Sequence, residues 1–412
     1  MKNENTYIVG VIAEYNPFHN GHQYHIQKSK EITKSKYCIA VMSGDFVQRG
    51  APAIYDKYTR TKMALECGAD LVIELPSIFA SSSAEDFASC GIALLDKLGV
   101  VDSVCFGSES GDIEELKAIS SILAAEPPVY TESLKEELKK GAAYPKARQT
   151  ALELSCPDHI DASLLSSPNN ILGVEYCKAL FKRKSSMIPY TIKRSGSGYH
   201  NADLTEGSFS SATGIRKAIM ENGNEVDSFV PDAVKRLMKH GYPVYADDFT
   251  LLLNAALLCL KEEGIPLSTF ADVSEELASR LEKQMLLFQS YEDRIQQLKT
   301  RQYTYTRISR ALLHILLGIT DNDIALGRSC DYAPYARVLG FRRSSAEILS
   351  EIKMRGAIPL ITKTADADKI LEEIPWSVFR KDLYCSHLYQ AVVQNKYHTL
   401  LKNEYTNSVV IL

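Results

Sequence analysis

The feature that most constrains the fold is a regular alternation of short apolar runs with helical segments over the first 110 residues. The apolar runs cover residues 6–13, 37–42, 71–75 and 101–106, and the helical segments cover about 21–33, 56–67 and 83–98. Short buried strands separated by helices are typical of a parallel sheet with crossover connections. The sequence therefore predicts an α/β protein whose ligand binds where the strands end.

The predicted pattern continues to about residue 225 and then changes. A strand at 187–193 leads into a Gly- and Ser-rich loop at 193–200, and a helix begins near Pro168, with Asn169 and Asn170 in its first turn. After residue 225 the apolar spacing predicts mostly helices, at 251–260, 273–287, 308–317 and 346–354. We expect a parallel-sheet domain over residues 1–225 and a mainly α-helical domain over 226–412.

Composition limits the classes of protein to consider. The 412 residues are enough for two or three domains, and a net charge of −4 gives no overall nucleic-acid signature. Nine cysteines without regular spacing suggest reduced thiols, and no signal peptide or membrane span is evident. We expect a soluble cytoplasmic protein that makes any nucleic-acid contact through a local patch.

The tetrapeptide His19-Asn20-Gly21-His22 follows the first predicted strand and opens the first helix. Unpaired backbone N–H groups and the helix dipole favour anions at such a position, and imidazoles add hydrogen-bond donors. The spacing fits the HxGH pattern of nucleotidyltransferase-like domains, which stabilise the α-phosphate while pyrophosphate leaves. Two alternatives remain: a metal site formed with His25, or histidines that only cap the helix.

A second anion-binding pattern runs from Ser208 to Arg216 and leads into another predicted helix. Ser and Thr hydroxyls at the N-terminus and an arginine one turn later suit a triphosphate. Taken alone, the pattern also fits an N-capped helix with a surface arginine. Its presence in the same α/β region as the histidine motif favours a nucleotide site.

A basic stretch between residues 301 and 357 is the candidate for a polyanionic partner. It holds nine basic and five acidic residues, which gives +4 locally in an acidic protein. Arg307 and Arg310 share one helix face, and the interleaved aromatic residues suit stacking on unpaired bases. The alternative is an ordinary solvated helix face.

Longer strings are much more specific than these short motifs. The segments 13–22, 41–50, 60–65, 70–76, 167–173 and 307–318 closely resemble the bacterial tRNA(Met) cytidine acetate ligase family, and the resemblance runs along nearly the whole chain. It implies an N-terminal Rossmann-like nucleotidyltransferase domain of the HUP type. It also implies that acetate and ATP form acetyl-adenylate and pyrophosphate, and that the acetyl group passes to the wobble cytidine of elongator tRNA(Met).

The residues and the resemblance together assign roles. His19 and His22 are the expected catalytic residues, Arg194, Arg216 and Lys193 are expected to hold phosphates bridged by Mg²⁺, and Asp45 is either a crevice residue or a helix cap. The full set expected at ATP is Ile12, Ala13, Glu14, Tyr15, Asn16, Pro17, Phe18, His19, Asn20, Gly21, His22, His25, Ser43, Gly44, Asp45, Gly107, Asn169, Asn170, Lys193, Arg194, Ser211 and Arg216. The residues expected at tRNA are Arg307, Arg310, Arg342 and Arg343. No residue is assigned to a resident metal.

Two other functions remain open at this point. A small-molecule adenylyltransferase needs only the α/β domain, so it leaves some 180 further residues unexplained. A non-catalytic nucleotide-dependent RNA-binding module leaves His19 and His22 without a task. Neither acetate selection nor oligomeric state can be derived from the sequence.

Overall fold

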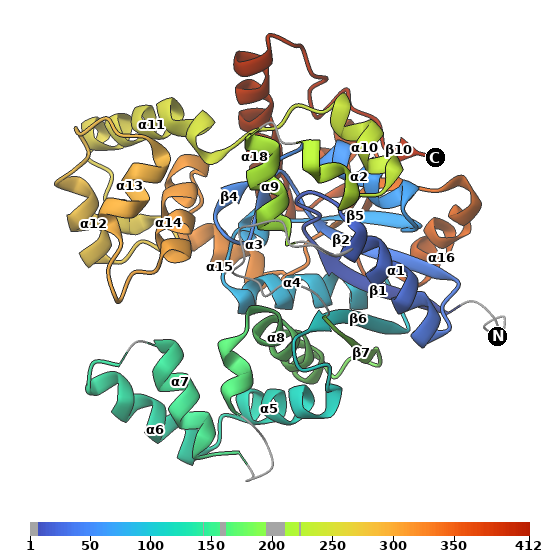
Figure 1. The fold of residues 1–412 in the computed structure, drawn as a ribbon, viewed down its shortest axis with the longest axis horizontal. Coiled ribbons are helices and arrows are strands. Elements are labelled where there is room, and N and C mark those ends of the chain that lie inside the picture. The colour runs from blue at the N-terminus through green and yellow to red at the C-terminus, as the bar shows by residue number, and fades with distance from the viewer. Residues whose placement is uncertain (1–6, 143, 157–161, 195–210, 222–223) are drawn as a thin grey trace.

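The computed structural model describes residues 7–142, 144–156, 162–194, 211–221 and 224–412 (Figure 1). Eight strands form one sheet in the order β10-β8-β5-β2-β1-β6-β7, with β9 paired to β8. The strands of this sheet are β1 Ile8–Ala13, β2 Tyr37–Ser43, β5 Leu71–Leu75, β6 Ser103–Ser108, β7 Ile188–Lys193, β8 Ala336–Phe341, β9 Leu360–Ile361 and β10 Val410–Ile411. A separate hairpin joins β3 Phe46–Val47 to β4 Ala51–Pro52.

The strands from β7 to β5 are mutually parallel, as the alternating pattern predicts. Strand β1 lies at the point where the order reverses, because β2 and β5 follow on one side while β6 and β7 follow on the other. In open α/β sheets, ligands bind at the carboxyl ends of the strands beside such a reversal. A ligand is therefore expected at the carboxyl ends of β1 and β6.

Helices of the first half cover both faces of the sheet. Val9 and Val11 of β1 pack toward α1 and α2, whereas Ile39 and Val41 of β2 belong to the cluster that includes α4 and α8. The helices up to residue 239 are α1 Asn20–Thr33, α2 Lys57–Glu66, α3 Ser77–Ala80, α4 Ala84–Lys97, α5 Ile113–Ala125, α6 Pro128–Lys139, α7 Tyr144–Glu153, α8 Pro168–Arg183, α9 Ala212–Met220 and α10 Asp232–Lys239.

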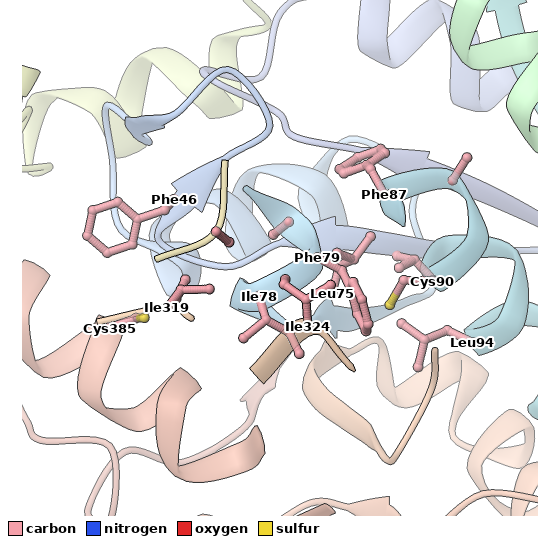
Figure 2. Packing of buried hydrophobic residues seen from close by; sticks show 14 of the residues in the cluster. Phe46, Leu75, Ile78, Phe79, Phe87, Cys90, Leu94, Ile319, Ile324 and Cys385 are labelled. Atoms are coloured by element: carbon pink, nitrogen blue, oxygen red, sulfur yellow. The ribbon is translucent and has the colours of Figure 1, made fainter. Parts of the chain in front are cut away.

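The second half is mainly helical, as predicted, and Figure 1 shows α11–α14 gathered to one side of the sheet. Its helices are α11 Thr250–Glu263, α12 Glu275–Glu282, α13 Tyr291–Leu298, α14 Tyr305–Leu317, α15 Asp321–Ser329, α16 Glu347–Arg355, α17 Ala367–Ile370 and α18 Glu373–Tyr397. The core is continuous between the halves, since Phe79 and Leu75 pack in one cluster with Ile324 (Figure 2).

The second half also supplies strands β8, β9 and β10, which the sequence analysis did not predict as part of the sheet. Strand β8 pairs antiparallel to β5, with Leu71 opposite Phe341, and β10 pairs parallel to β8. The sheet therefore crosses the proposed boundary at residue 225. The division into domains at that residue stays a prediction.

A buried ionic cluster joins the two halves beneath this part of the sheet. Lys57 forms ion pairs with Glu74 at 2.8 Å and Glu404 at 2.9 Å, and Arg337 pairs with the same carboxylates at 3.1 Å and 2.6 Å. All four side chains are at most 3% exposed. Two cations and two carboxylates compensate each other, because a single buried charge would be strongly unfavourable.

Candidate active site

Two histidines cap helix α1 at the carboxyl end of β1. The Nδ1 atom of His19 accepts a hydrogen bond from the Gly21 N–H at 3.1 Å, and Nδ1 of His22 accepts one from the His19 N–H at 3.2 Å. Their rings stack with centroids 3.7 Å apart. A ring nitrogen that accepts from an N–H carries no proton, so in each neutral imidazole the proton lies on Nε2. Both rings therefore present Nε2–H as a donor.

These imidazoles are held in the neutral state. Burial lowers the pKa of His19 to about 3, and the positive charges of Arg194 and Arg216 act in the same direction. Burial and the charge of Arg194 lower the pKa of His25 to about 4, and burial also lowers the pKa of His22. At neutral pH the site thus has imidazole donors beside two guanidinium groups, which suits an anion.

Capping and phosphate binding are compatible here, since each ring caps the helix through Nδ1 and can donate to a phosphate through Nε2–H. The capping alternative is therefore part of the arrangement. In the described part of the chain, no group of three His, Cys, Asp or Glu side chains is placed to hold a metal ion, and the metal alternative stays untested.

Several residues of the predicted ATP segment turn their side chains inward. Tyr15 and Phe18 are buried with ring centroids 4.8 Å apart, and the Asn16 side chain accepts from the Ile54 N–H at 2.8 Å. Asn20 donates through its backbone N–H to the Phe229 carbonyl at 2.9 Å. These residues shape the turn, which also contains a cis Asn16–Pro17 peptide, and any contact of Tyr15 or Phe18 with a nucleotide is expected through the backbone.

Gly107 and Arg194 meet at the ends of β6 and β7. A Cβ atom at Gly107 would lie only 3.2 Å from Cγ of Arg194, so the glycine lets the arginine cross this strand end. The backbone N–H of Arg194 donates to the Ser108 carbonyl at 2.9 Å. Lys193 ends β7 and is exposed. The charge of Arg194 acts on His19, so the two residues lie near each other, and a contact of Arg194 with ATP stays a prediction.

Helix α9 brings the second predicted motif to the first. Arg216 donates to the Asn16 carbonyl at 2.7 Å and to the Thr213 hydroxyl at 3.1 Å. Ser211 caps the helix by accepting from the Gly214 N–H at 3.1 Å. The predicted loop 195–200 and the start of the second motif, 208–210, lie outside the described residues.

Asn169 and Asn170 organise the loop that follows β6. The Asn170 side-chain oxygen accepts from the backbone N–H groups of Glu109 and Ser110 at 2.9 Å and 3.2 Å. In return, the Glu109 carboxylate accepts from the Asn170 N–H at 2.8 Å and from the Asn169 side chain at 2.6 Å. Glu109 was not predicted. The sequence feature that could have identified Glu109 is an acidic residue directly after a strand, because its carboxylate can bind the N–H groups at a helix N-terminus.

Arg60 is a second residue that the sequence analysis missed. Its fully buried guanidinium donates to the carbonyls of Tyr55 at 2.8 Å, Glu14 at 2.7 Å and Ser43 at 3.0 Å, and also to the carbonyl of Gly44. One side chain thereby joins the ends of β1 and β2. Arg60 lies on the buried face of α2, and no local pattern in the sequence distinguishes this role from that of a solvated surface arginine.

Asp45 shows the helix-terminus role that the sequence left as an alternative. Its carboxylate accepts from the Lys57 N–H, at the start of α2, at 2.8 Å. Burial raises the pKa of Asp45 to about 6, and the positive charge of Lys57 opposes the rise. A contact of Asp45 with ATP stays a prediction.

The four arginines expected at tRNA form two pairs, which lie at opposite ends of the parallel strands. Arg307 and Arg310 lie on α14, which packs on the loop that follows β2. In contrast, the Arg342 N–H donates to the Asp70 carbonyl at 2.9 Å, just before β5 begins, and Arg343 follows it. The two pairs thus lie apart on the protein, and the contact of each pair with tRNA stays a prediction.

Several cations of the basic stretch are neutralised by carboxylates outside it. Arg310 binds Asp272 at 2.9 Å and 3.2 Å, and Arg328 binds Asp86 at 3.0 Å and 2.8 Å. Arg337 belongs to the buried ionic cluster. The local charge of +4 counted along the sequence therefore overstates the charge displayed on the surface. The Arg307 guanidinium lies 4.9 Å from the centre of the buried Tyr303 ring, and its contact with tRNA stays a prediction.

Comparisons with known proteins agree with this geometry. The family model described as HIGH Nucleotidyl Transferase matches residues 6–404. A tRNA(Met) cytidine acetate ligase of Caldanaerobacter subterraneus subsp. tengcongensis is 44% identical over 393 residues, 94% of this chain and 96% of the relative. The corresponding protein of Acetivibrio thermocellus is 40% identical over 416 residues, 98% of this chain and all of the relative.

Solved structures of Thermotoga maritima TmcAL superpose over 99% of this chain and 100% of their own, at 32% identity. The TM-score is 0.92 for an apo form and 0.90 for a form bound with alpha-thio ATP. Among the described residues of the present chain, the helices are all too short or too polar to cross a membrane.

Proposed function

Because the chain belongs to the tRNA(Met) cytidine acetate ligase family, we propose that it uses ATP to activate acetate and acetylates the wobble cytidine of elongator tRNA(Met). The observation that carries the proposal is the stacked pair of neutral imidazoles at the N-terminus of α1. Their Nε2–H donors lie beside Arg194 and Arg216, where an α-phosphate gains negative charge during displacement.

The first step joins acetate to AMP. An acetate oxygen attacks the α-phosphorus of ATP, a new oxygen–phosphorus bond forms, and the bond to the bridging oxygen of pyrophosphate breaks. Donors from His19 and His22 stabilise the α-phosphoryl oxygens, while Arg194, Lys193 and Arg216 hold the departing phosphates. Neutral imidazoles perform this task across the neutral pH range without taking up a proton.

The second step transfers acetyl to the tRNA. The exocyclic amine of the cytidine attacks the carbonyl carbon of acetyl-adenylate, a carbon–nitrogen bond forms, and the carbon–oxygen bond to AMP breaks. The amine loses one proton to solvent. Arg307 is the proposed phosphate contact on α14, and Tyr305 at the start of the same helix has an exposed ring that could stack on an unpaired anticodon base.

Mg²⁺ is proposed to enter with ATP rather than to reside on the protein. Mg²⁺ is commonly bound through substrate phosphates together with one or two carboxylates. Bound there, it would neutralise phosphate charge. A tRNA substrate places the proposed reaction in the cytoplasm.

The test is incubation of the protein with ATP, acetate and tRNA, followed by mass spectrometry of the digested nucleosides. We expect N4-acetylcytidine that depends on both ATP and acetate. His22→Ala should lower acetate-dependent AMP formation about 10²–10³-fold. Nucleotide transfer to a small molecule with no acetylcytidine would favour the adenylyltransferase alternative and reject the proposal.

A second variant tests the tRNA surface. Arg307→Glu should weaken tRNA binding, increasingly so at low salt where phosphate contacts are strongest, and leave acetate-dependent pyrophosphate exchange intact. Arg310 is less suitable for charge reversal because its ion pair with Asp272 would be lost as well. Equal loss of exchange in Arg307→Glu would point to a structural role.

A further inference from the structure

The β3–β4 hairpin lies between the nucleotide crevice and helix α14. Its turn contains Gly50, which has a φ of +77°. A Cβ atom at Gly50 would lie 2.5 Å from the carbonyl carbon of Ser309 and closer still to the backbone nitrogen of Arg310. The hairpin therefore approaches the backbone of α14 so closely that a side chain at this position would force the two apart.

A buried hydrogen bond fixes this contact. The Ser309 hydroxyl donates to the Gly50 carbonyl at 2.8 Å, and Ser309 is 2% exposed. The Tyr291 hydroxyl in turn donates to the Ser309 carbonyl at 3.3 Å. The hydrogen bond comes from a side chain, but Gly50 itself packs against the main chain of Ser309 and Arg310, so the contact sets the position of the helix backbone.

The opposite side of the hairpin is fastened to the crevice. The Gln48 N–H, two residues before Gly50, donates to the Glu14 carboxylate at 3.0 Å. The strand end that leads into the hairpin is held independently, because Arg60 binds the carbonyls of Ser43 and Gly44. The hairpin thus connects α14 to the segment that leads to His19, through the Ser309–Gly50 contact on one side and the Gln48–Glu14 contact on the other.

From these contacts we infer that Gly50 and Ser309 are positioning residues that set the tRNA-carrying helix α14 relative to the acetyl-adenylate. The inference rests on the proposed function. We expect Gly50 and Ser309 to affect acetyl transfer and not adenylate formation. When the contact between Gly50 and α14 is altered, Arg60 still holds the strand end beside the nucleotide site. An error of about 1 Å in the placement of reacting groups is enough to slow a step about 10²-fold.

Helix α14 has a second attachment that keeps it in place when the first is weakened. The His314 ring lies 3.1 Å from the Ser81 carbonyl through Nε2 and 3.0 Å from the Ala271 carbonyl through Nδ1. The helix also shares the continuous core with the sheet. Altering the Gly50 contact should therefore shift or tilt α14 without detaching it.

The experiment compares Gly50→Ala and Ser309→Ala with the matched control Gly264→Ala. Gly264 has a similar left-handed backbone, with φ of +67°, but nothing lies within 4 Å of an added Cβ. Each variant is assayed for acetate-dependent ATP–pyrophosphate exchange, for tRNA binding, and for the single-turnover rate of acetyl transfer from preformed acetyl-adenylate. Thermal melting is measured in parallel.

We expect Gly50→Ala to lower the transfer rate about 10²-fold, with exchange and tRNA affinity within about threefold of wild type. Ser309→Ala, which adds no steric conflict, should lower transfer about tenfold, and Gly264→Ala should leave it unchanged. Parallel loss of exchange and transfer, or unchanged transfer in Ser309→Ala, overturns the inference. If Gly50→Ala does not fold, the acetyl-transfer rate of Ser309→Ala alone decides whether the inference holds. Failure of wild type to acetylate tRNA would instead reject the proposed function.

Discussion

Acidification should destabilise the protein through its buried imidazoles, and His19→Asn isolates the effect of one of them. His19 is buried, and its pKa in the folded protein is about 3 against 6.5 for an exposed histidine. Asparagine is a good helix N-cap, so the variant retains an acceptor for the Gly21 N–H while it removes the titrating ring. Wild type and variant should then differ chiefly in their dependence on pH.

The sign and size follow from proton linkage. Below pH 6.5 the unfolded chain binds a proton at His19 that the folded chain does not, so the free energy of unfolding falls as the pH falls. The slope approaches about 1.4 kcal/mol per pH unit, which amounts to about 2 kcal/mol between pH 7 and pH 5. Above pH 7 the contribution vanishes because both states are neutral.

The assay is urea unfolding followed by circular dichroism at pH 7, 6 and 5. We expect the free energy of unfolding of wild type to fall by about 2 kcal/mol more than that of His19→Asn over this range. A difference between the proteins that is constant with pH would show that His19 titrates as an exposed residue. It would also remove the basis for treating it as a neutral donor to phosphate.

Three further predictions concern other parts of the structure. Arg60→Lys should lower acetate-dependent pyrophosphate exchange about 10²-fold in a protein that still melts cooperatively, because an ammonium does not reach all four carbonyls; unchanged exchange would show that the strand ends hold without it. Gly107→Ala should displace Arg194 and raise the KM for ATP about tenfold in steady-state assays, the equivalent of one weakened charge-assisted hydrogen bond, and an unaltered KM would contradict it. Glu404→Gln should lower the free energy of unfolding by about 3–5 kcal/mol at pH 7. Since Lys57 and Arg337 lower the pKa of Glu404 to about 2 despite its burial, its stabilising effect should fade in wild type below pH 4.5, and urea titrations that show the same acid sensitivity in both proteins would refute this.

Local patterns were sufficient to predict the parallel part of the sheet. Strands β1, β2, β6 and β7 are short apolar runs that lead into Gly or polar residues, and β5 is stopped by Pro76; each of these features is visible within a window of ten residues. The meeting of Arg216 with the turn after β1 was also predictable, because both motifs suit one ligand.

Strand β8 escaped prediction because its environment is made by residues distant in the sequence. Arg337 interrupts the apolar run 336–341, and a charged residue at a buried position argues against a central strand. Its carboxylate partners are distant in the sequence, since Glu74 lies opposite Arg337 on β5 and Glu404 follows α18. The same limit explains why the basic stretch was over-counted, since the partners of Arg310 and Arg328 also lie outside it.

The buried ionic cluster has a consequence for synthesis of the protein on the ribosome. Lys57 and Glu74 emerge early and Arg337 late, but Glu404 emerges only after some 400 residues have been made. Until then, two cations would share one carboxylate at a buried position, and β8 would lack its neighbour β10. Domains usually begin to fold while the rest of the chain is being translated. In this chain, we expect the ionic cluster and the β8–β10 end of the sheet to reach their final form only near the end of translation.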